Sequence, residues 1–364
     1  MSTLACSAHR VRGCTCIRLR RVPPALLTGT VPVHNLNLNS WTFKFPRGGG
    51  KGALICFRPR EAAGPRTMQG KAGARARDAL AALRARLGDA AGVEAEFGAV
   101  PDAAAGAKMY AAQLPQNQGA NRYYNVSPYD HNRVLLRAST SGRDYINASW
   151  VESASGAWPG RYIACQGPLE ETAGDFWQMV VEQGAPVIVQ LTNFVEDGRL
   201  KCFQYVPLEA GQAAAHGGLT VTVRSVRRLL PGLEHREVAV AGGPGGGTHA
   251  VDHFLYTDWP DFGVPESSES IRRLLEITRE KYGEGQVPVV HCSAGIGRTG
   301  VFCVLDITLK RLYRGPEGAD ATGVADLAAL LGELRGSRMG MVQTLGQYTF
   351  CYEALVADLE ARAA

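Results

Sequence analysis

From residue 95 to residue 362, short apolar runs of strand length alternate with longer segments in which apolar residues recur at helical spacing. The strand-like runs are Tyr162–Cys165, Val187–Leu191, Leu219–Val226, His253–Thr257 and Val287–His291. The helical segments are Gly174–Gln183, Glu266–Tyr282, Val301–Tyr313, Val324–Leu334 and Gly346–Ala361. Strands and helices mixed along one chain in this way predict an α/β fold, with a twisted mixed β-sheet flanked by α-helices.

The N-terminal part of the chain differs from the rest in charge. Residues 1–60 contain ten Lys and Arg residues and no Asp or Glu, whereas the whole chain has 39 basic and 34 acidic residues and a net charge of +5. We therefore expect a basic extension at residues 1–70, an Ala/Arg-rich helical lead-in at residues 71–94 and a folded domain at residues 95–362. The extension has the composition of an organelle transit peptide or of a disordered arm that binds anionic surfaces, and a wrongly assigned start codon would also produce it.

The cysteines and the apolar runs bear on the compartment. Nine cysteines are spaced irregularly, without the paired spacing of a zinc ribbon, and only Cys14 and Cys16 lie close together. Free thiols and no metal are therefore expected. No run reaches the roughly 20 apolar residues of a membrane span, and prolines interrupt the stretch from Val22 to Val33, unlike a secretory signal. We predict a cytoplasmic protein, with the nucleus and an organelle reached through the basic N-terminus as alternatives.

The stretch from Val287 to Gly300 carries the chemistry. A short apolar strand leads into a Gly-rich turn and then into a helix, so the backbone N–H groups of residues 293–298 can converge on one tetrahedral anion. A helix N-terminus and a neighbouring cation favour the ionised form of a thiol, so Cys292 is expected to react as a thiolate. Arg298 can bind two oxygens of a phosphoryl group. The turn residues expected to bind the phosphoryl group with it are Ser293, Ala294, Gly295, Ile296 and Gly297.

Two neighbours of this turn are expected to assist. Thr299 offers a hydroxyl suited to help the sulfur leave in a second half-reaction, and His291 would tune the thiol through hydrogen bonds. The string His-Cys-Ser-Ala-Gly-Ile-Gly-Arg-Thr-Gly resembles the signature loop of the classical, non-receptor-like protein tyrosine phosphatases. Dual-specificity phosphatases share the Cys and the Arg but usually fill the spacer differently.

A second motif supplies a proton donor. The segment Trp259–Pro265 places Asp261 between a proline and a glycine, in a loop that could swing over the site. It resembles the mobile acid loop of the same family and precedes the Cys loop, as it does in that family. The resemblance implies that Asp261 protonates the leaving tyrosyl oxygen and then acts as a base on water, with Trp259 in a supporting position.

Two further segments match the family. Gln343 and Gln347 are four residues apart and would share one face if a helix begins here; the resemblance implies that Gln343 guides the hydrolytic water. Residues 121–133 and 144–149 resemble the loop that recognises phosphotyrosine. The resemblance implies that Tyr123 stacks on the substrate ring and sets the pocket depth. Asn125 stands where the family often has Asp, so it gives up charge-assisted bonds to the substrate main chain.

The segment Glu196–Lys201 resembles the loop of this family that pairs a glutamate with the signature arginine and a lysine with the closed acid loop. We therefore expect Glu196 to orient Arg298, and Lys201 to contact the acid loop. We expect Cys202 and Cys303 to be core cysteines.

These motifs occur in the family's order and predict an enzyme that hydrolyses phosphotyrosine in proteins through a phosphocysteine, without a metal or organic cofactor. Mitogen-activated protein kinases are candidate substrates by family analogy alone. No nucleic-acid partner is expected, and the sequence does not determine the oligomeric state. The alternatives are a dual-specificity phosphatase and an inactive phosphotyrosine-binding module. Such a module usually lacks the Cys, the Arg or the acid-loop Asp, and all three are present here.

Overall fold

The computed structural model divides the chain into two units, Met1–Arg66 and Thr67–Ala364. It describes residues 7–11, 14–19 and 53–57 in the first unit, and residues 70–363 in the second apart from 138–140, 154, 157, 159, 244–245, 261–262, 284 and 315–320. In the first unit, β1 (Ser7–Val11), β2 (Cys14–Leu19) and β3 (Ala53–Phe57) form an antiparallel three-stranded sheet. The assignment of residues 1–70 as a transit peptide or a disordered arm stays a prediction.

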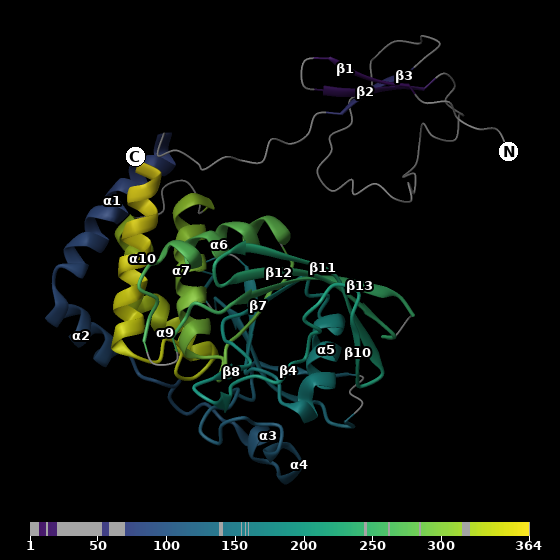
Figure 1. Cartoon of the computed structure of the whole chain (residues 1–364). Helices are drawn as coiled ribbons and strands as arrows, with labels where there is room; N and C mark the ends of the chain where they lie inside the picture. The colour runs from purple at the N-terminus through teal and green to yellow at the C-terminus, as the bar shows by residue number, and fades with distance from the viewer. Residues whose placement is uncertain are drawn as a thin grey trace. The chain divides into compact units, whose positions relative to one another are not determined.

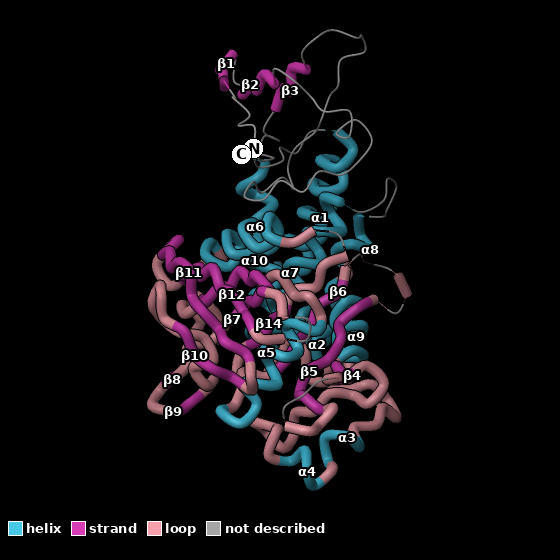
Figure 2. The backbone as a smooth tube through the Cα atoms, turned by 90° about the vertical axis from the view of Figure 1, so that its right-hand side faces the viewer, coloured by secondary structure: helices cyan, strands magenta, loops and turns pink. Residues whose placement is uncertain are grey.

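The second unit is built on a nine-stranded sheet with the order β10-β11-β12-β13-β7-β14-β6-β5-β4. The strands from β13 to β6 are parallel to one another and all other pairs are antiparallel, so the sheet is mixed as the sequence predicts. In that order the strands are Ala213–His216, Leu219–Leu230, Leu233–Ala241, Thr248–Tyr256, Val187–Gln190, Val289–His291, Arg161–Cys165, Tyr145–Glu152 and Arg133–Leu135. Figure 2 shows β10 and β11 at one edge of the sheet and β5 and β4 at the other.

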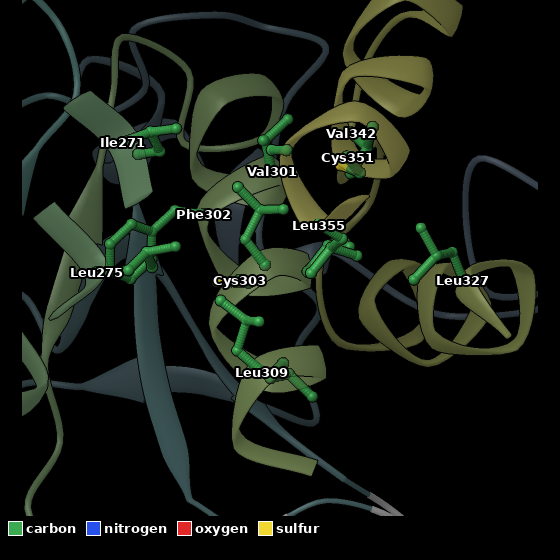
Figure 3. Packing of buried hydrophobic residues seen from close by; sticks show 14 of the residues in the cluster. Ile271, Leu275, Val301, Phe302, Cys303, Leu309, Leu327, Val342, Cys351 and Leu355 are labelled. Carbon is green, nitrogen blue, oxygen red and sulfur yellow. The ribbon is translucent and has the colours of Figure 1, made fainter. Parts of the chain in front are cut away.

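The central parallel strands are covered on both faces, which explains their continuous apolar sequence. Every residue of β7 and of β14 is buried. Helix α5 (Ala173–Glu182) covers one face, and its core includes Phe176 and Trp177. The opposite face is covered by α6 (Glu269–Lys281), α7 (Gly297–Arg314) and α10 (Leu345–Ala363) (Figure 1). Figure 3 shows side chains of α6, α7, α9 (Leu327–Ser337) and α10 meeting in this second core.

The lead-in helices pack on the domain. Helix α1 (Gly70–Leu87) contacts α10 and α8 (Ala321–Ala325), and α2 (Ala90–Ala99) also contacts α10 (Figure 1). The buried residues of α1 recur at helical spacing on one side; they are Ala76, Ala79, Leu80 and Leu83. The Ala/Arg-rich composition therefore encodes a docked helix whose arginines lie mostly outside the core.

Some element boundaries differ from those predicted. The helix expected over Val324–Leu334 is two helices, because Asp326 ends the first and caps α9 by accepting a hydrogen bond from Ala329 N–H at 2.9 Å. The helix expected from Val301 begins at Gly297, inside the Gly-rich turn. The sequence pattern did not reveal two long strands, β5 and β12, or several short elements: α3 (Tyr110–Gln113), α4 (Pro115–Gln118), the 3₁₀ turn Glu170–Thr172, β4, β8 (Val195–Glu196), β9 (Arg199–Leu200) and β10.

Replacing Leu83 by Ala should lower the free energy of unfolding by about 3 kcal/mol, because the side chain is 1% exposed where α1 joins the core. Urea denaturation of the full chain measures this. The control is Asp78→Ala on the exposed side of the same helix, which should change stability by less than about 0.5 kcal/mol. Equal stability of the two variants would show that α1 is not part of the folded core.

Candidate active site

The Cys loop joins β14 to α7 and is shaped by a glycine. Cys292 is 5% exposed, and its Sγ accepts a hydrogen bond from Gly295 N–H at 3.3 Å. Gly295 has a φ of +74°, and a Cβ at this position would lie 2.0 Å from the carbonyl oxygen of Cys165. Only glycine fits there, so the tight turn that folds the loop around the thiol depends on this residue.

The carbonyl groups of the loop are held from outside. Since N–H and C=O point in opposite directions in a trans peptide, fixing the carbonyls outward directs the following N–H groups inward. There they can surround an anion next to the thiol. The bonds are from Gly167 N–H to Ser293 O (2.9 Å), from Arg338 Nη2 to Ala294 O (3.0 Å), from Arg338 Nε to Gly295 O (2.9 Å) and from Val342 N–H to Ile296 O (3.1 Å).

Arg298 lies in the first turn of α7 and is fixed by a bidentate ion pair. Its Nη1 and Nη2 donate to Oε1 and Oε2 of Glu196 at 2.7 and 2.9 Å, with both side chains almost fully buried. Nη1 also donates to Leu191 O at 3.0 Å, and Nη2 to Pro260 O at 3.1 Å. The guanidinium plane is therefore set by Glu196, and it is linked directly to the acid loop.

Asp261, with the following Phe262, lies outside the described residues. The flanking parts of its loop are described: Trp259 is buried, and its indole N–H donates to Gly263 O at 3.1 Å. Both ends of the loop border a cavity of about 870 Å³, which is lined on its other side by residues 193 and 195–197. The described ends of the loop thus border open space as well as the core.

The two glutamines meet the Cys loop, although only one is helical. Helix α10 begins at Leu345, so Gln343 precedes the helix and the two side chains do not share a helical face. Instead, Gln343 N–H donates to Gln347 Oε1 at 2.9 Å. A Cβ at Gly297 would lie 2.9 Å from Gln347 Oε1 and 3.4 Å from Gln343 Oε1. Both amides therefore lie against the Cys loop.

Tyr123 also reaches the Cys loop. Its hydroxyl lies 2.9 Å from Ser293 Oγ, which donates to the main-chain oxygen of Lys201 at 2.9 Å. Arg122 anchors the segment, because its Nε and Nη2 donate to Gly167 O at 3.1 Å and Pro168 O at 2.7 Å. The backbone at Tyr123 is thereby fixed beside the loop, whereas Asn125 is exposed to solvent.

A family model described as protein-tyrosine phosphatase matches residues 117–357, which include all of these segments. The chain belongs to the protein tyrosine phosphatase family.

Three relatives illustrate the similarity of this chain to other members of the family. Protein-tyrosine-phosphatase PTP1 of Arabidopsis thaliana is 38% identical over 258 residues, covering 67% of this chain and 71% of that protein. Receptor-type tyrosine-protein phosphatase H of Homo sapiens is 39% identical over 69% of this chain and 22% of that protein. Tyrosine-protein phosphatase non-receptor type 4 of Mus musculus is 38% identical over 70% of this chain and 27% of that protein. The chain therefore spans only about a quarter of the length of the last two relatives.

Two expected site residues are enclosed inside the phosphatase domain. His291 is fully buried, and burial lowers its pKa to about 4, so the ring is neutral at physiological pH. Thr299 is also fully buried, and its hydroxyl has no hydrogen-bond partner among the described residues. A buried hydroxyl without a hydrogen-bond partner is costly.

Arg338 was not found from the sequence. It is fully buried, which lowers the pKa of its guanidinium, and besides the two loop carbonyls it donates to Ser149 Oγ at 3.1 Å and Asn147 Oδ1 at 2.8 Å. Its sequence neighbourhood is polar and resembles a solvated surface segment. Nothing in the sequence indicates that four distant groups converge on this side chain.

The described residues contain no other centre that would extend this chemistry. No group of three His, Cys, Asp or Glu side chains among them could hold a metal ion. Cys165, Cys202, Cys303 and Cys351 are buried free thiols, and burial raises the pKa of each one.

None of the described helices is long and apolar enough to cross a membrane.

Gly295→Ala should weaken binding of orthovanadate about 100-fold, because the added Cβ displaces the turn that directs the loop N–H groups. Isothermal titration calorimetry measures the affinity. Gly332→Ala in α9 is the matched control, since a Cβ at that position would meet no atom within 4 Å apart from the nearby backbone of its own helix. Unchanged vanadate binding by Gly295→Ala would contradict this account of the loop.

The buried neutral state of His291 should make folding stability depend on pH. Burial lowers its pKa from the ordinary 6.5 of a histidine to about 4 in the folded protein, so the unfolded chain binds the proton first as pH falls. The stability contributed by the neutral ring is present above pH 6.5 and is lost between pH 6.5 and pH 4. In that window the free energy of unfolding of the wild type should fall more steeply than that of His291→Gln, by about 1.4 kcal/mol per pH unit. Urea denaturation of both proteins at pH 5 and pH 6 measures this. An equal change in the free energy of unfolding between the two pH values for wild type and variant would disprove it.

Proposed function

We propose that the domain hydrolyses phosphotyrosine in proteins in two steps, with Cys292 as the nucleophile. The observation that carries the proposal is a buried thiol that accepts a hydrogen bond from Gly295 N–H, in the same loop as a guanidinium held by Glu196. In the first step the sulfur attacks phosphorus, the bond to the tyrosyl oxygen breaks, and Arg298 with the loop N–H groups stabilises the charge on the phosphoryl oxygens. Asp261 gives its proton to the departing phenolate.

The second step transfers the phosphoryl group from sulfur to water. We assign Gln343 to orienting this water, supported by its amide next to Gly297, and Asp261 to accepting its proton. Thr299 is assigned to stabilising the departing sulfur, supported by its buried hydroxyl without a partner. Lys201 is assigned to the closed acid loop. Each step uses a side chain or a backbone N–H group of this chain, so the mechanism invokes no metal or organic cofactor.

Selectivity for phosphotyrosine is proposed to come from the depth of the pocket. Tyr123 lies next to Ser293, so a substrate ring stacked on it would have its phosphate at the floor of the loop. Phosphoserine and phosphothreonine are too short to span this depth. Asn125 is exposed and neutral, so it would hold the substrate main chain less tightly than a carboxylate would.

The substrate class and the cellular location of the protein are also proposed. Proteins that carry phosphotyrosine are the proposed substrate class, and mitogen-activated protein kinases are candidates within it. A cytoplasmic location is supported by the free cysteines of the domain. Fluorescence microscopy of the tagged full chain distinguishes the cytoplasm from the nucleus and from an organelle.

The full chain should release phosphate from a phosphotyrosine peptide and not from the matching phosphothreonine peptide, in the presence of chelator and with inhibition by vanadate. Cys292→Ser should abolish turnover and keep binding. Asp261→Ala should lower kcat about 100-fold or more and retain the bound substrate, because the leaving phenolate is no longer protonated.

The outcomes separate the candidate functions. Comparable turnover of both peptides would assign the dual-specificity class. Tight binding of the phosphotyrosine peptide without turnover would make the domain a binding module. Full activity of Cys292→Ser would exclude the phosphocysteine mechanism.

A further inference from the structure

A chain of buried polar side chains lies behind the Cys loop. Four side chains form it, and all of them are fully buried: Gln190 at the end of β7, His253 on β13, His291 on β14, and Tyr205. Gln190 Oε1 lies 3.1 Å from His253 Nε2, which lies 3.0 Å from the hydroxyl of Tyr205. That hydroxyl lies 2.7 Å from His291 Nε2, and His291 Nδ1 lies 3.1 Å from the carbonyl oxygen of Cys292.

The amide of Gln190 fixes the direction of this chain at one end. Its Nε2 donates to the carbonyl oxygen of Thr192 at 2.9 Å, so the atom that faces His253 is the oxygen. A carbonyl oxygen only accepts hydrogen bonds. The Nε2 of His253 must therefore carry a proton. Burial and the positive charge of Arg236 hold the pKa of His253 well below its ordinary value, so the ring is neutral and Nε2 carries its one proton.

The donor and acceptor of each remaining hydrogen bond, through Tyr205 to the Cys loop, are then fixed as well. A protonated Nε2 has no lone pair, so Tyr205 cannot donate to His253 and its hydroxyl proton is directed to His291 Nε2. Because His291 is also neutral, its proton resides on Nδ1 and is donated to the carbonyl oxygen of Cys292. The reverse tautomer would place a nitrogen lone pair against that oxygen, which is repulsive.

We propose that Gln190 and His253 are positioning residues for the nucleophile. Through Tyr205 they fix the Nδ1–H tautomer of His291, which holds the carbonyl of Cys292 and with it the first peptide group of the phosphate-binding loop. This carbonyl joins those of residues 293–296, so the whole loop is held from outside. The inference rests on the proposed role of Cys292 as the nucleophile.

The surroundings of the chain favour this arrangement. His253 is surrounded by Arg236 and His235 on β12 and His291 on β14, which lower its pKa, and by the hydroxyl of Tyr205. Arg122 lowers the pKa of His291. Gln190 is the only polar residue of β7, a strand that is otherwise Val-Ile-Val. A buried amide in a central strand is costly unless both of its polar atoms are bonded, and here both of them are.

The tautomers can be observed directly in the full chain without substrate. Long-range ¹H–¹⁵N NMR spectra should show His253 protonated at Nε2 and His291 protonated at Nδ1. The opposite tautomer at either residue would overturn the proposal. This measurement uses the wild type, so it does not depend on whether a variant folds.

Variants test the consequence for the thiolate. Gln190→Met keeps the volume and removes the acceptor, and Tyr205→Phe interrupts the chain at its middle. Each variant should slow alkylation of Cys292 by iodoacetamide at pH 6 by about fivefold, the value of roughly one hydrogen bond. The double variant should be alkylated no more slowly than either single variant, because both changes interrupt the same row of hydrogen bonds. Mass spectrometry of the peptide that contains Cys292 separates it from the other cysteines.

The matched control is Gln178→Met on α5. Gln178 is also a buried glutamine, but it bonds to Glu182 and takes no part in the hydrogen bonds from Gln190 to Cys292. It should alkylate at the wild-type rate. Wild-type alkylation of Gln190→Met, or additive losses in the double variant, would overturn the proposal. Alkylation requires no substrate, so these outcomes are independent of whether the protein hydrolyses phosphotyrosine.

Discussion

The outward fixing of the carbonyl groups in the Cys loop is the constraint on which the rest of the site depends. A loop whose peptide groups were free to turn would present carbonyl oxygens to a phosphoryl group about as often as N–H groups, and its affinity for an anion would be lost. Donors from distant parts of the chain prevent this. They come from Gly167 after β6, from Arg338 after α9, from Val342 before α10 and from His291 at the end of β14. The site is therefore a product of the whole domain.

A second consequence is the way in which charge is distributed around the loop. Arg298 is paired with Glu196, whereas Arg338 bonds to two loop carbonyls and binds only neutral oxygens. Two buried cations therefore belong to the Cys loop, Arg298 at its helical end and Arg338 against its carbonyl groups. A negative charge placed in the loop would be stabilised by both guanidinium groups, because the low polarizability of the interior weakens screening.

The apolar core supports these polar contacts by making them rigid. Helix α7 begins inside the Gly-rich turn and then passes between α6 and α10, and its apolar residues other than Tyr313 are buried. Close packing on both sides leaves the first turn of the helix little freedom, so Arg298 and Thr299 are held relative to β14. The lead-in helix α1 extends the same core over α10, which carries Gln347.

The sequence by itself determined the fold class, the family and the loop with its thiol and guanidinium, because each depends on local patterns: apolar periodicity, or residues adjacent in the chain. Only the tertiary structure decided what holds that loop in its active shape. Arg338 and Gln190 look like an ordinary surface arginine and an interruption of a strand, and α8 and α9 look like one helix until Asp326 is seen to cap the second. Their partners lie far away in sequence. A hydrogen bond between residues brought together by folding leaves no periodic trace in the chain, so no pattern along the sequence could reveal it.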